Sequence, residues 1–147
     1  QFSLLSPDLL KQNNVKRICE DNDIDFLAYS PLSFGILCID PEKDEDKQNS
    51  FLRSLIFKNY KKSTTELRRC LKKIAVSRSV SQAQVAVNWC CYQGAIPLVG
   101  MRKRSHVIDI SNVFKWNLNQ KEFGMLQQAS QKCLKKMKSS KILFYVV

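Results

Sequence analysis

Two short apolar runs, separated by helical patterns, limit what this chain can fold into. Residues 24–29 (IDFLAY) end at Ser30-Pro31, and residues 95–99 (AIPLV) end at Gly100. Between them, apolar residues recur with helical spacing. Strands that alternate with helices indicate βα units and a parallel sheet, whose strands are buried on both faces. The sequence therefore predicts an α/β fold with parallel strands.

Capping signals divide the rest of the chain into helices. Ser6-Pro7-Asp8 combines an N-cap residue, a first-turn proline and an acid, which is typical of a helix start. Residues 63–66 (STTE) and 81–84 (SQAQ) have the spacing of capping boxes, and residues 119–122 (NQKE) mark another start. Gly94 is the residue expected just past a helix end. We therefore expect helices after residue 6, over 51–60, after 63, over about 82–93, around 105–112, and from about 119 to 133.

The expected sheet is too small to close on itself. Beside the two firm strands, only residues 2–5 read as the end of a third, and such a sheet has unpaired edges. The chain has 147 residues, which is enough for a sizeable core, and it begins without Met. We therefore expect part of a larger fold, or an assembly with another chain. Residues 1–134 form the expected folded unit, followed by a basic and then apolar tail over 135–147.

The positive charge allows two interpretations. The net charge is +11 and the sequence pI about 9.5. A basic face of this kind is typical of nucleic-acid-binding domains. The lysines, however, are spread along the helical patterns, and aromatic residues do not alternate with them as a base-stacking platform requires. We therefore favour a lysine-rich solvated surface, with a few charges left for a cofactor pocket.

The cysteines and apolar runs bear on compartment and metal binding. Six scattered cysteines without a CxxC pair, and a single histidine, give little support for a disulfide framework or a zinc site. We expect free thiols in a reducing compartment and no bound metal. The last apolar run, residues 142–147, is far shorter than the roughly 18 residues of a membrane-spanning helix. With no secretory signal visible, we expect a cytoplasmic protein without a membrane partner.

Five motifs follow one another along the chain. They are residues 1–6 (QFSLLS), 25–32 (DFLAYSPL, followed by Gly35), 81–89 (SQAQVAVNW), 94–100 (GAIPLVG), and 116–122 (WNLNQKE). In this order and spacing they resemble the second half of the aldo-keto reductase barrel, over nearly residues 1–133, and the plant and plastid-type members most. The resemblance implies the C-terminal half of a (β/α)8 TIM-type barrel, with its site at the C-terminal ends of the strands. It also adds a plastid-like organelle as a second location.

The resemblance assigns the nicotinamide and pyrophosphate end of a cofactor site to residues after the first strand. Tyr29 matches the aromatic ring that lies against the nicotinamide and orients it. Arg53 matches a position that contacts the phosphates, a role that suits a guanidinium. The implied residues of this part are Tyr29, Ser30, Pro31, Leu32, Gly35 and Arg53.

The basic turn after the second strand matches the adenosine end of the site. Arg102 matches the position that meets the adenosine 2′-phosphate, which implies NADPH rather than NADH, and Lys103 or Arg104 adds charge. Where the family usually has an adenine-reading Asn, this chain has Ile110, which cannot form those hydrogen bonds. The implied residues of this part are Gly100, Met101, Arg102, Lys103, His106 and Asp109.

No position here matches the family's catalytic Asp, Tyr, Lys and His, which lie in the first half of the barrel. The resemblance thus implies an NADPH-dependent reductase of aldehydes or ketones, whose cofactor-binding C-terminal half is this chain. The other half of the barrel and a small carbonyl substrate are the implied partners. A non-catalytic, cofactor-binding relative is the second hypothesis, favoured by Ile110. A nucleic-acid-binding domain is the third, and strong loss of affinity with rising salt would support it.

Overall fold

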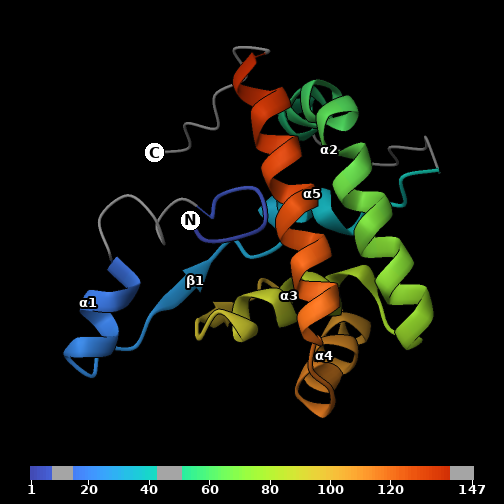
Figure 1. Ribbon diagram of the computed structural model, residues 1–147. Coiled ribbons are helices and arrows are strands. Elements are labelled where there is room, and N and C mark those ends of the chain that lie inside the picture. The colour runs from blue at the N-terminus through green and yellow to red at the C-terminus, as the bar shows by residue number, and fades with distance from the viewer. Residues whose placement is uncertain (8–14, 43–50, 140–147) are drawn as a thin grey trace.

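The computed structural model describes residues 1–7, 15–42 and 51–139. Helices form most of it, and a small sheet lies to one side of them (Figure 1). The elements in chain order are α1 (Val15–Asp21), β1 (Leu27–Tyr29), η2 (Ser33–Cys38), α2 (Phe51–Arg78), α3 (Gln82–Tyr92), β2 (Ile96–Leu98), α4 (Arg104–Ser111), η3 (Asn112–Lys115) and α5 (Gln120–Ser139).

The two strands are parallel, so the α/β prediction is confirmed. Leu27, Ala28 and Tyr29 pair with Ile96, Pro97 and Leu98, in that order. On the other edge of β1, the Phe2 N–H donates to the Tyr29 carbonyl over 3.2 Å, where the sequence predicts the end of a third strand. Residues 3 and 6 then form an isolated bridge instead of continuing along the sheet.

The prediction that both strands are buried on both faces was wrong. Ala28 is fully buried, but Leu27, Tyr29, Ile96 and Leu98 are between 45% and 54% exposed. Strand residues alternate between faces, so these four side chains lie on one face, and no described layer covers it. We call these four residues the open sheet face. The expected six-residue first strand is also shorter, at three residues.

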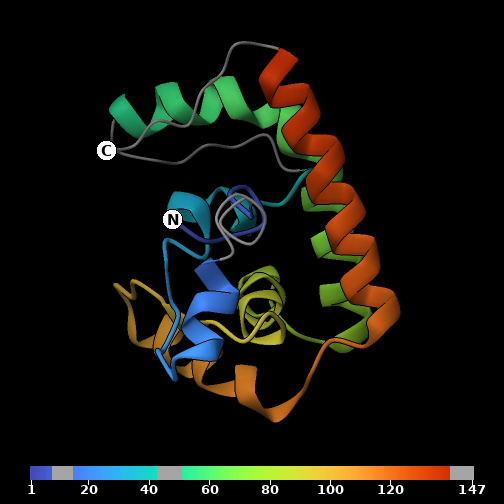
Figure 2. The same cartoon turned by 60° about the vertical axis from the view of Figure 1, so that its left-hand side comes forward.

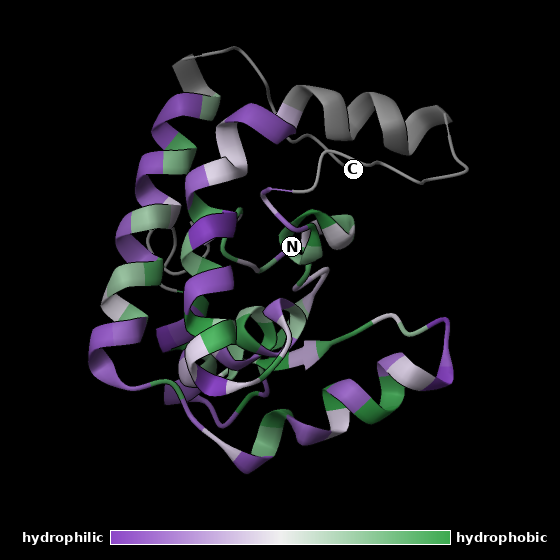
Figure 3. Cartoon of the chain, turned by 90° about the vertical axis from the view of Figure 1, so that its right-hand side faces the viewer, coloured by the Kyte–Doolittle hydropathy of each residue, from purple (hydrophilic) through white to green (hydrophobic). Residues whose placement is uncertain are grey.

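The core lies between the covered face of the sheet and the helices. Trp89 of α3 is fully buried and stacks on Phe2 at 5.3 Å and on Phe123 of α5 at 6.4 Å between ring centroids. The long helices α2 and α5 pack against each other (Figure 2). Hydrophobic and hydrophilic residues alternate along both, as expected for helices with one packed face (Figure 3).

The expected helix start at residues 63–66 was wrong, because α2 continues through it for 28 residues in all. The Thr64 hydroxyl donates to the Tyr60 carbonyl at 2.8 Å, and that of Thr65 to the Lys61 carbonyl at 2.7 Å. Hydroxyls bonded to the preceding turn are accommodated inside a helix and often bend it. The helix changes direction along its length (Figure 2).

The other capping predictions were largely confirmed. The Ser81 hydroxyl accepts from the Gln84 N–H at the start of α3, and Gly94 past its end has φ +76°. Asn119 and Glu122 cap α5 reciprocally at 2.8 and 2.9 Å. That helix crosses residue 134 and ends at Ser139. The helix start predicted from Ser6 falls mainly on residues 8–14, which lie outside the described residues.

Glu122 also joins α5 to the end of α2. Its carboxylate accepts two hydrogen bonds of 2.8 Å from Arg78, which hold the pKa of Glu122 below its ordinary 4.5. A lowered folded-state pKa adds stability that is present above pH 4.5 and is lost as the pH falls through the folded value. We therefore expect the difference in unfolding free energy between the natural chain and Glu122→Gln to shrink as the pH is lowered from 6 to about 3.

Urea unfolding at several pH values measures this difference. Glu66→Gln is the exposed comparison: its carboxylate pairs with Lys136 across the same two helices, which also lowers the pKa of Glu66, and because both side chains are more exposed a smaller pH-dependent difference is expected. If the difference in unfolding free energy between the natural chain and Glu122→Gln stays constant down to pH 3, the result contradicts a stabilising ion pair between Arg78 and Glu122.

All six cysteines are free thiols, as expected. Across the described ranges there is no cluster of metal-ligating side chains and no helix long and apolar enough to cross a membrane.

Candidate functional site

The two candidate segments begin at the same edge of the sheet. Because β1 and β2 are parallel, with Tyr29 opposite Leu98, their C-terminal ends lie side by side. The segment after β1 runs from Ser30 into η2, and the segment after β2 runs from Gly100 into α4. Ligands of parallel α/β sheets bind at this end of the strands.

The segment after β1 is a series of tight turns. Tyr29 is half exposed on the open sheet face, while Pro31 beyond it is buried. Four positions have a left-handed backbone, with φ of 56° at Ser30, 48° at Ser33, 57° at Phe34 and 89° at Gly35. For residues other than glycine this conformation costs about 1–2 kcal/mol, and such strain gathers at ligand-binding sites.

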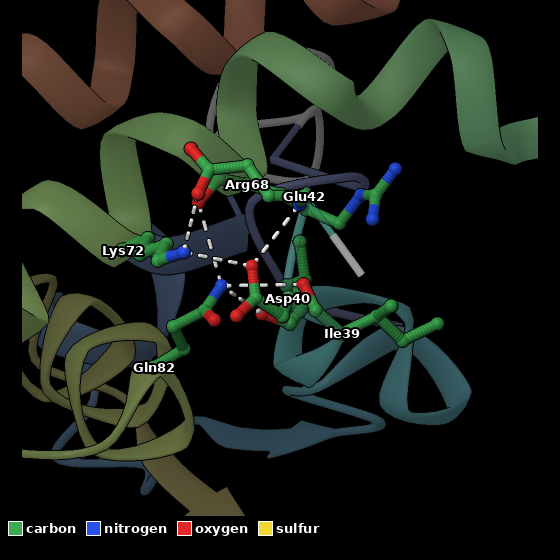
Figure 4. Close-up of polar contacts among 7 residues, drawn as sticks. Ile39, Asp40, Glu42, Arg68, Lys72 and Gln82 are labelled. Carbon is green, nitrogen blue, oxygen red and sulfur yellow. Dashed lines mark hydrogen bonds and ion pairs between the residues drawn. The ribbon is translucent and has the colours of Figure 1, made fainter. Parts of the chain in front are cut away.

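Side chains of α2 and α3 hold this segment in place (Figure 4). The Lys72 ammonium binds Asp40 and Glu42, both at 2.9 Å, and these hydrogen bonds raise the pKa of Lys72. The Gln82 amide lies 3.4 Å from the Leu37 carbonyl and 3.5 Å from that of Ile39. These contacts hold residues 37–42, which follow the turns directly.

The segment after β2 is exposed and basic. Gly100, Met101, Arg102, Lys103, Arg104 and His106 are all exposed. Helix α4 has no acid in its first turn and no side-chain hydrogen bond at its N-cap, Lys103. Free N–H groups and a positive dipole end at a helix N-terminus favour anions. The arrangement therefore fits a phosphate group.

Asp109 lies in a different environment from the other candidate residues. Its carboxylate faces the first turn of α3, where it accepts from the Ser81 hydroxyl at 2.6 Å and from the Gln84 amide at 2.7 Å. Asp109 and its neighbour Ile110 are both partly buried. Arg53 lies in α2, but its side chain is outside the described part of the molecule.

The residues that hold the site were missed by the sequence analysis. Lys72, Gln82 and Gln84 lie on helices and reach segments 25 to 45 positions away in the chain. Lys72 and Gln82 carry no local signal beyond a polar residue on a helix, and Gln84 reads only as part of a capping box. The structure thus brings together Tyr29, Ser30 and the basic turn, and adds the side chains that support them.

The family model for the Aldo/keto reductase family matches residues 1–131. This chain belongs to that family. Pyridoxal reductase, chloroplastic, of Arabidopsis thaliana is 34% identical over 137 residues, which are 93% of this chain and 37% of that protein. Rhazimal reductase 2 of Alstonia scholaris is 27% identical over 123 residues, 83% of this chain and 31% of that protein. The chain spans about a third of the length of these two relatives.

Membership of the Aldo/keto reductase family carries the (β/α)8 barrel as its fold. In an aldo-keto reductase chain, a small parallel sheet with helices on one face is part of a barrel wall. The open sheet face is the side of this sheet that the described helices leave uncovered. Both candidate segments start at the end of the strands where barrels of this type bind ligands.

Proposed function

We propose that this chain supplies the cofactor-binding part of an NADPH-dependent reductase of aldehydes or ketones. The observation that carries the proposal is that two segments start side by side at the C-terminal edge of a parallel sheet, one strained and one basic. A dinucleotide is long enough to lie across both segments. The exposed, basic and uncapped start of α4 fits its phosphate groups.

Each candidate residue except Asp109 then has a defined part in binding. The half-exposed ring of Tyr29 orients the nicotinamide, and the turns over Ser30, Pro31, Leu32 and Gly35 approach the pyrophosphate. Arg53 is the proposed further contact of the phosphates. Gly100 to Lys103 lie at the adenosine phosphate, and His106 lies beside the ribose. When bound, the cofactor supplies the hydride, and these residues hold it in position.

The remaining part of the barrel supplies the catalytic residues and is the proposed partner of this chain. The open sheet face offers it an apolar surface, and the outer edge of β2 offers backbone groups that no described strand pairs. For the assembled protein we propose a cytoplasmic location, with a plastid as the alternative suggested by the name of the Arabidopsis relative.

The isolated 147-residue chain is expected to show no reductase turnover, because the proton donor belongs to the other part of the barrel. Loss of NADPH absorbance with pyridoxal, the aldehyde named by one relative, and with a simple aromatic aldehyde measures this. The comparison is the same chain combined with the other part of the barrel, taken from a related reductase. Turnover by the chain alone, above a no-protein control, would overturn the proposed division of roles.

Replacing Arg102 with alanine is expected to weaken NADPH binding about tenfold or more, because a hydrogen-bonded charge pair contributes roughly 1.5–3 kcal/mol. NADH lacks the 2′-phosphate, so its affinity is expected to change by less than about twofold. Titration calorimetry of the natural chain and the variant with each cofactor measures the change in the two dissociation constants. Arg69→Ala, an exposed arginine of α2, is the control. Equal losses for both cofactors would mean that Arg102 does not meet the 2′-phosphate.

Ile110 favours a second candidate function, a relative that binds cofactor without catalysis. Its side chain is partly buried and apolar where the family resemblance expects an adenine-reading amide. Ile110→Asn separates the two candidates. A large gain in NADPH affinity without any gain in turnover of the assembled protein would support the non-catalytic role.

A further inference from the structure

The first turn of α3 touches both candidate cofactor segments. Gln82 reaches the carbonyls of Leu37 and Ile39 in the segment after β1. Ser81 and Gln84 reach Asp109 of α4, the helix that follows the basic turn. One helix end therefore connects the two segments, and the contacts to Asp109 are the shorter ones, at 2.6 and 2.7 Å against 3.4 and 3.5 Å.

The contacts of Asp109 have a fixed geometry. Each carboxylate oxygen accepts one hydrogen bond, Oδ2 from the Ser81 hydroxyl and Oδ1 from the Gln84 amide. The same Ser81 oxygen caps α3 by accepting from the Gln84 backbone N–H at 3.0 Å. The other end of the Gln84 amide accepts from the Trp116 indole at 3.1 Å, and Gln84 is only 5% exposed. Buried polar groups with partners at both ends have a single favourable orientation.

Helix α4 has few other attachments. None of its residues is buried, and it lies at the lower end of the molecule in Figure 1. Val107 and Ile108 are each at least half exposed, so packing does little to fix the helix. The hydrogen bonds of Asp109 are thus the direct side-chain link from α4 to α3 among the described residues, while η3, which follows α4, is held separately by buried Val113 and Asn88.

We infer that Asp109 is a positioning residue, which with Ser81 and Gln84 holds the basic turn in place, and not an adenosine ligand as the family resemblance implies. The carboxylate is turned toward α3, while the exposed side chains of Arg102, Lys103 and His106 face solvent. The link fixes where the positive charges lie relative to the turns after β1. The ligand named here, NADPH, rests on the proposed function.

Three variants of the full chain test the inference. Gln84→Met removes the amide at similar volume, Asp109→Ala removes the carboxylate, and Asp109→Asn keeps one acceptor for Gln84 and a donor for the Ser81 oxygen. Ser111→Ala is the matched control, because it removes an exposed hydrogen bond inside α4 and leaves α3 untouched. The readouts are hydrogen exchange of the α4 amides without cofactor, and dissociation constants for NADPH and NADH.

Gln84→Met and Asp109→Ala are expected to speed exchange in α4 about tenfold and to leave α5 unchanged. Both are expected to weaken NADPH binding by roughly tenfold and NADH binding much less. The reason is that displaced basic side chains no longer contact the 2′-phosphate, which NADH lacks. Asp109→Asn is expected to retain most of the natural exchange rate and affinity. Ser111→Ala is expected to match the natural chain in both measurements.

Two results would overturn the inference. One is that the α4 amides of both Gln84→Met and Asp109→Ala exchange hydrogen as slowly as those of the natural chain. The other is a loss of NADPH affinity in Asp109→Ala and Asp109→Asn alike while Gln84→Met binds normally, because that pattern identifies a direct ligand. If Gln84→Met does not fold, the contrast between Asp109→Ala and Asp109→Asn gives the same decision. A natural chain that binds no NADPH refutes the proposed function, and the exchange rates still decide the role of Asp109.

Discussion

Replacing Trp89 with alanine is expected to lower the free energy of unfolding by about 3–5 kcal/mol, which approaches the whole stability of many domains. The side chain is fully buried and stacks between Phe2 at the N-terminus and Phe123 of α5. Its loss leaves a large cavity where the sheet, α3 and α5 meet. Urea unfolding followed by circular dichroism measures the change.

Two further variants sharpen this test. The Trp89 indole nitrogen is buried without a hydrogen-bond partner among the described residues, so Trp89→Phe is expected to cost far less than the alanine. Tyr92→Ala removes another aromatic ring of α3 that stacks on Phe123 at 4.3 Å but is 44% exposed, and a smaller loss is expected there. Equal losses for Trp89→Ala and Tyr92→Ala would contradict the central place of Trp89 in the core.

Replacing Asn88 with alanine is expected to cost about 2–4 kcal/mol, because it leaves buried backbone groups without partners. The amide nitrogen donates to the carbonyls of Val113 at 3.1 Å and Trp116 at 2.8 Å, and its oxygen accepts from the Leu118 N–H at 3.0 Å. Asn88 is only 2% exposed, so water does not replace these contacts easily. The variant is also expected to increase hydrogen exchange in the segment between α4 and α5, which Asn88 holds in place.

Asn112→Ala is the matched control for Asn88, since its amide makes one exposed hydrogen bond, to the Ile108 carbonyl. Its free energy of unfolding is expected to stay within about 0.5 kcal/mol of the value for the natural chain. Hydrogen exchange of the Leu118 amide gives a local check on Asn88→Ala. Continued protection of that amide would show that the backbone between α4 and α5 does not depend on Asn88.

The elements that the sequence predicted well have strong local causes. Ser81 and Asn119 cap their helices through groups three residues away, and Gly94 takes a positive φ just past a helix end. The parallel pairing of the two strands follows from the helices between them. None of these features requires knowledge of distant parts of the chain.

The predictions that were wrong concerned features that depend on contacts with distant segments, or on whether any segment covers a surface. The threonines at 64 and 65 look like a helix start, but their hydroxyls bond inside a helix that packs against α5. The apolar strands suggest burial on both faces, whereas only the Ala28 side is covered by described residues. Local sequence does not show which neighbours a surface has.

The same distinction applies to the candidate site. The motifs predicted the two candidate segments, since glycine, proline and basic residues after strands are typical of ligand-binding turns, and the structure starts both segments at one edge of the sheet. They did not indicate that Asp109 faces α3, because the partners of its carboxylate, Ser81 and Gln84, lie 28 and 25 positions earlier in the chain. Side-chain contacts over such separations depend on how whole helices pack.

The open sheet face has a consequence for how this chain behaves in solution. Leu27, Tyr29, Ile96 and Leu98 form an apolar surface beside an edge of β2 that no strand of the described ranges pairs, a combination that promotes self-association. The net charge of +11 opposes it, because molecules of like charge repel each other at a distance. Salt screens that repulsion and leaves the apolar attraction intact. The colloidal stability of the isolated chain is therefore expected to depend on low ionic strength.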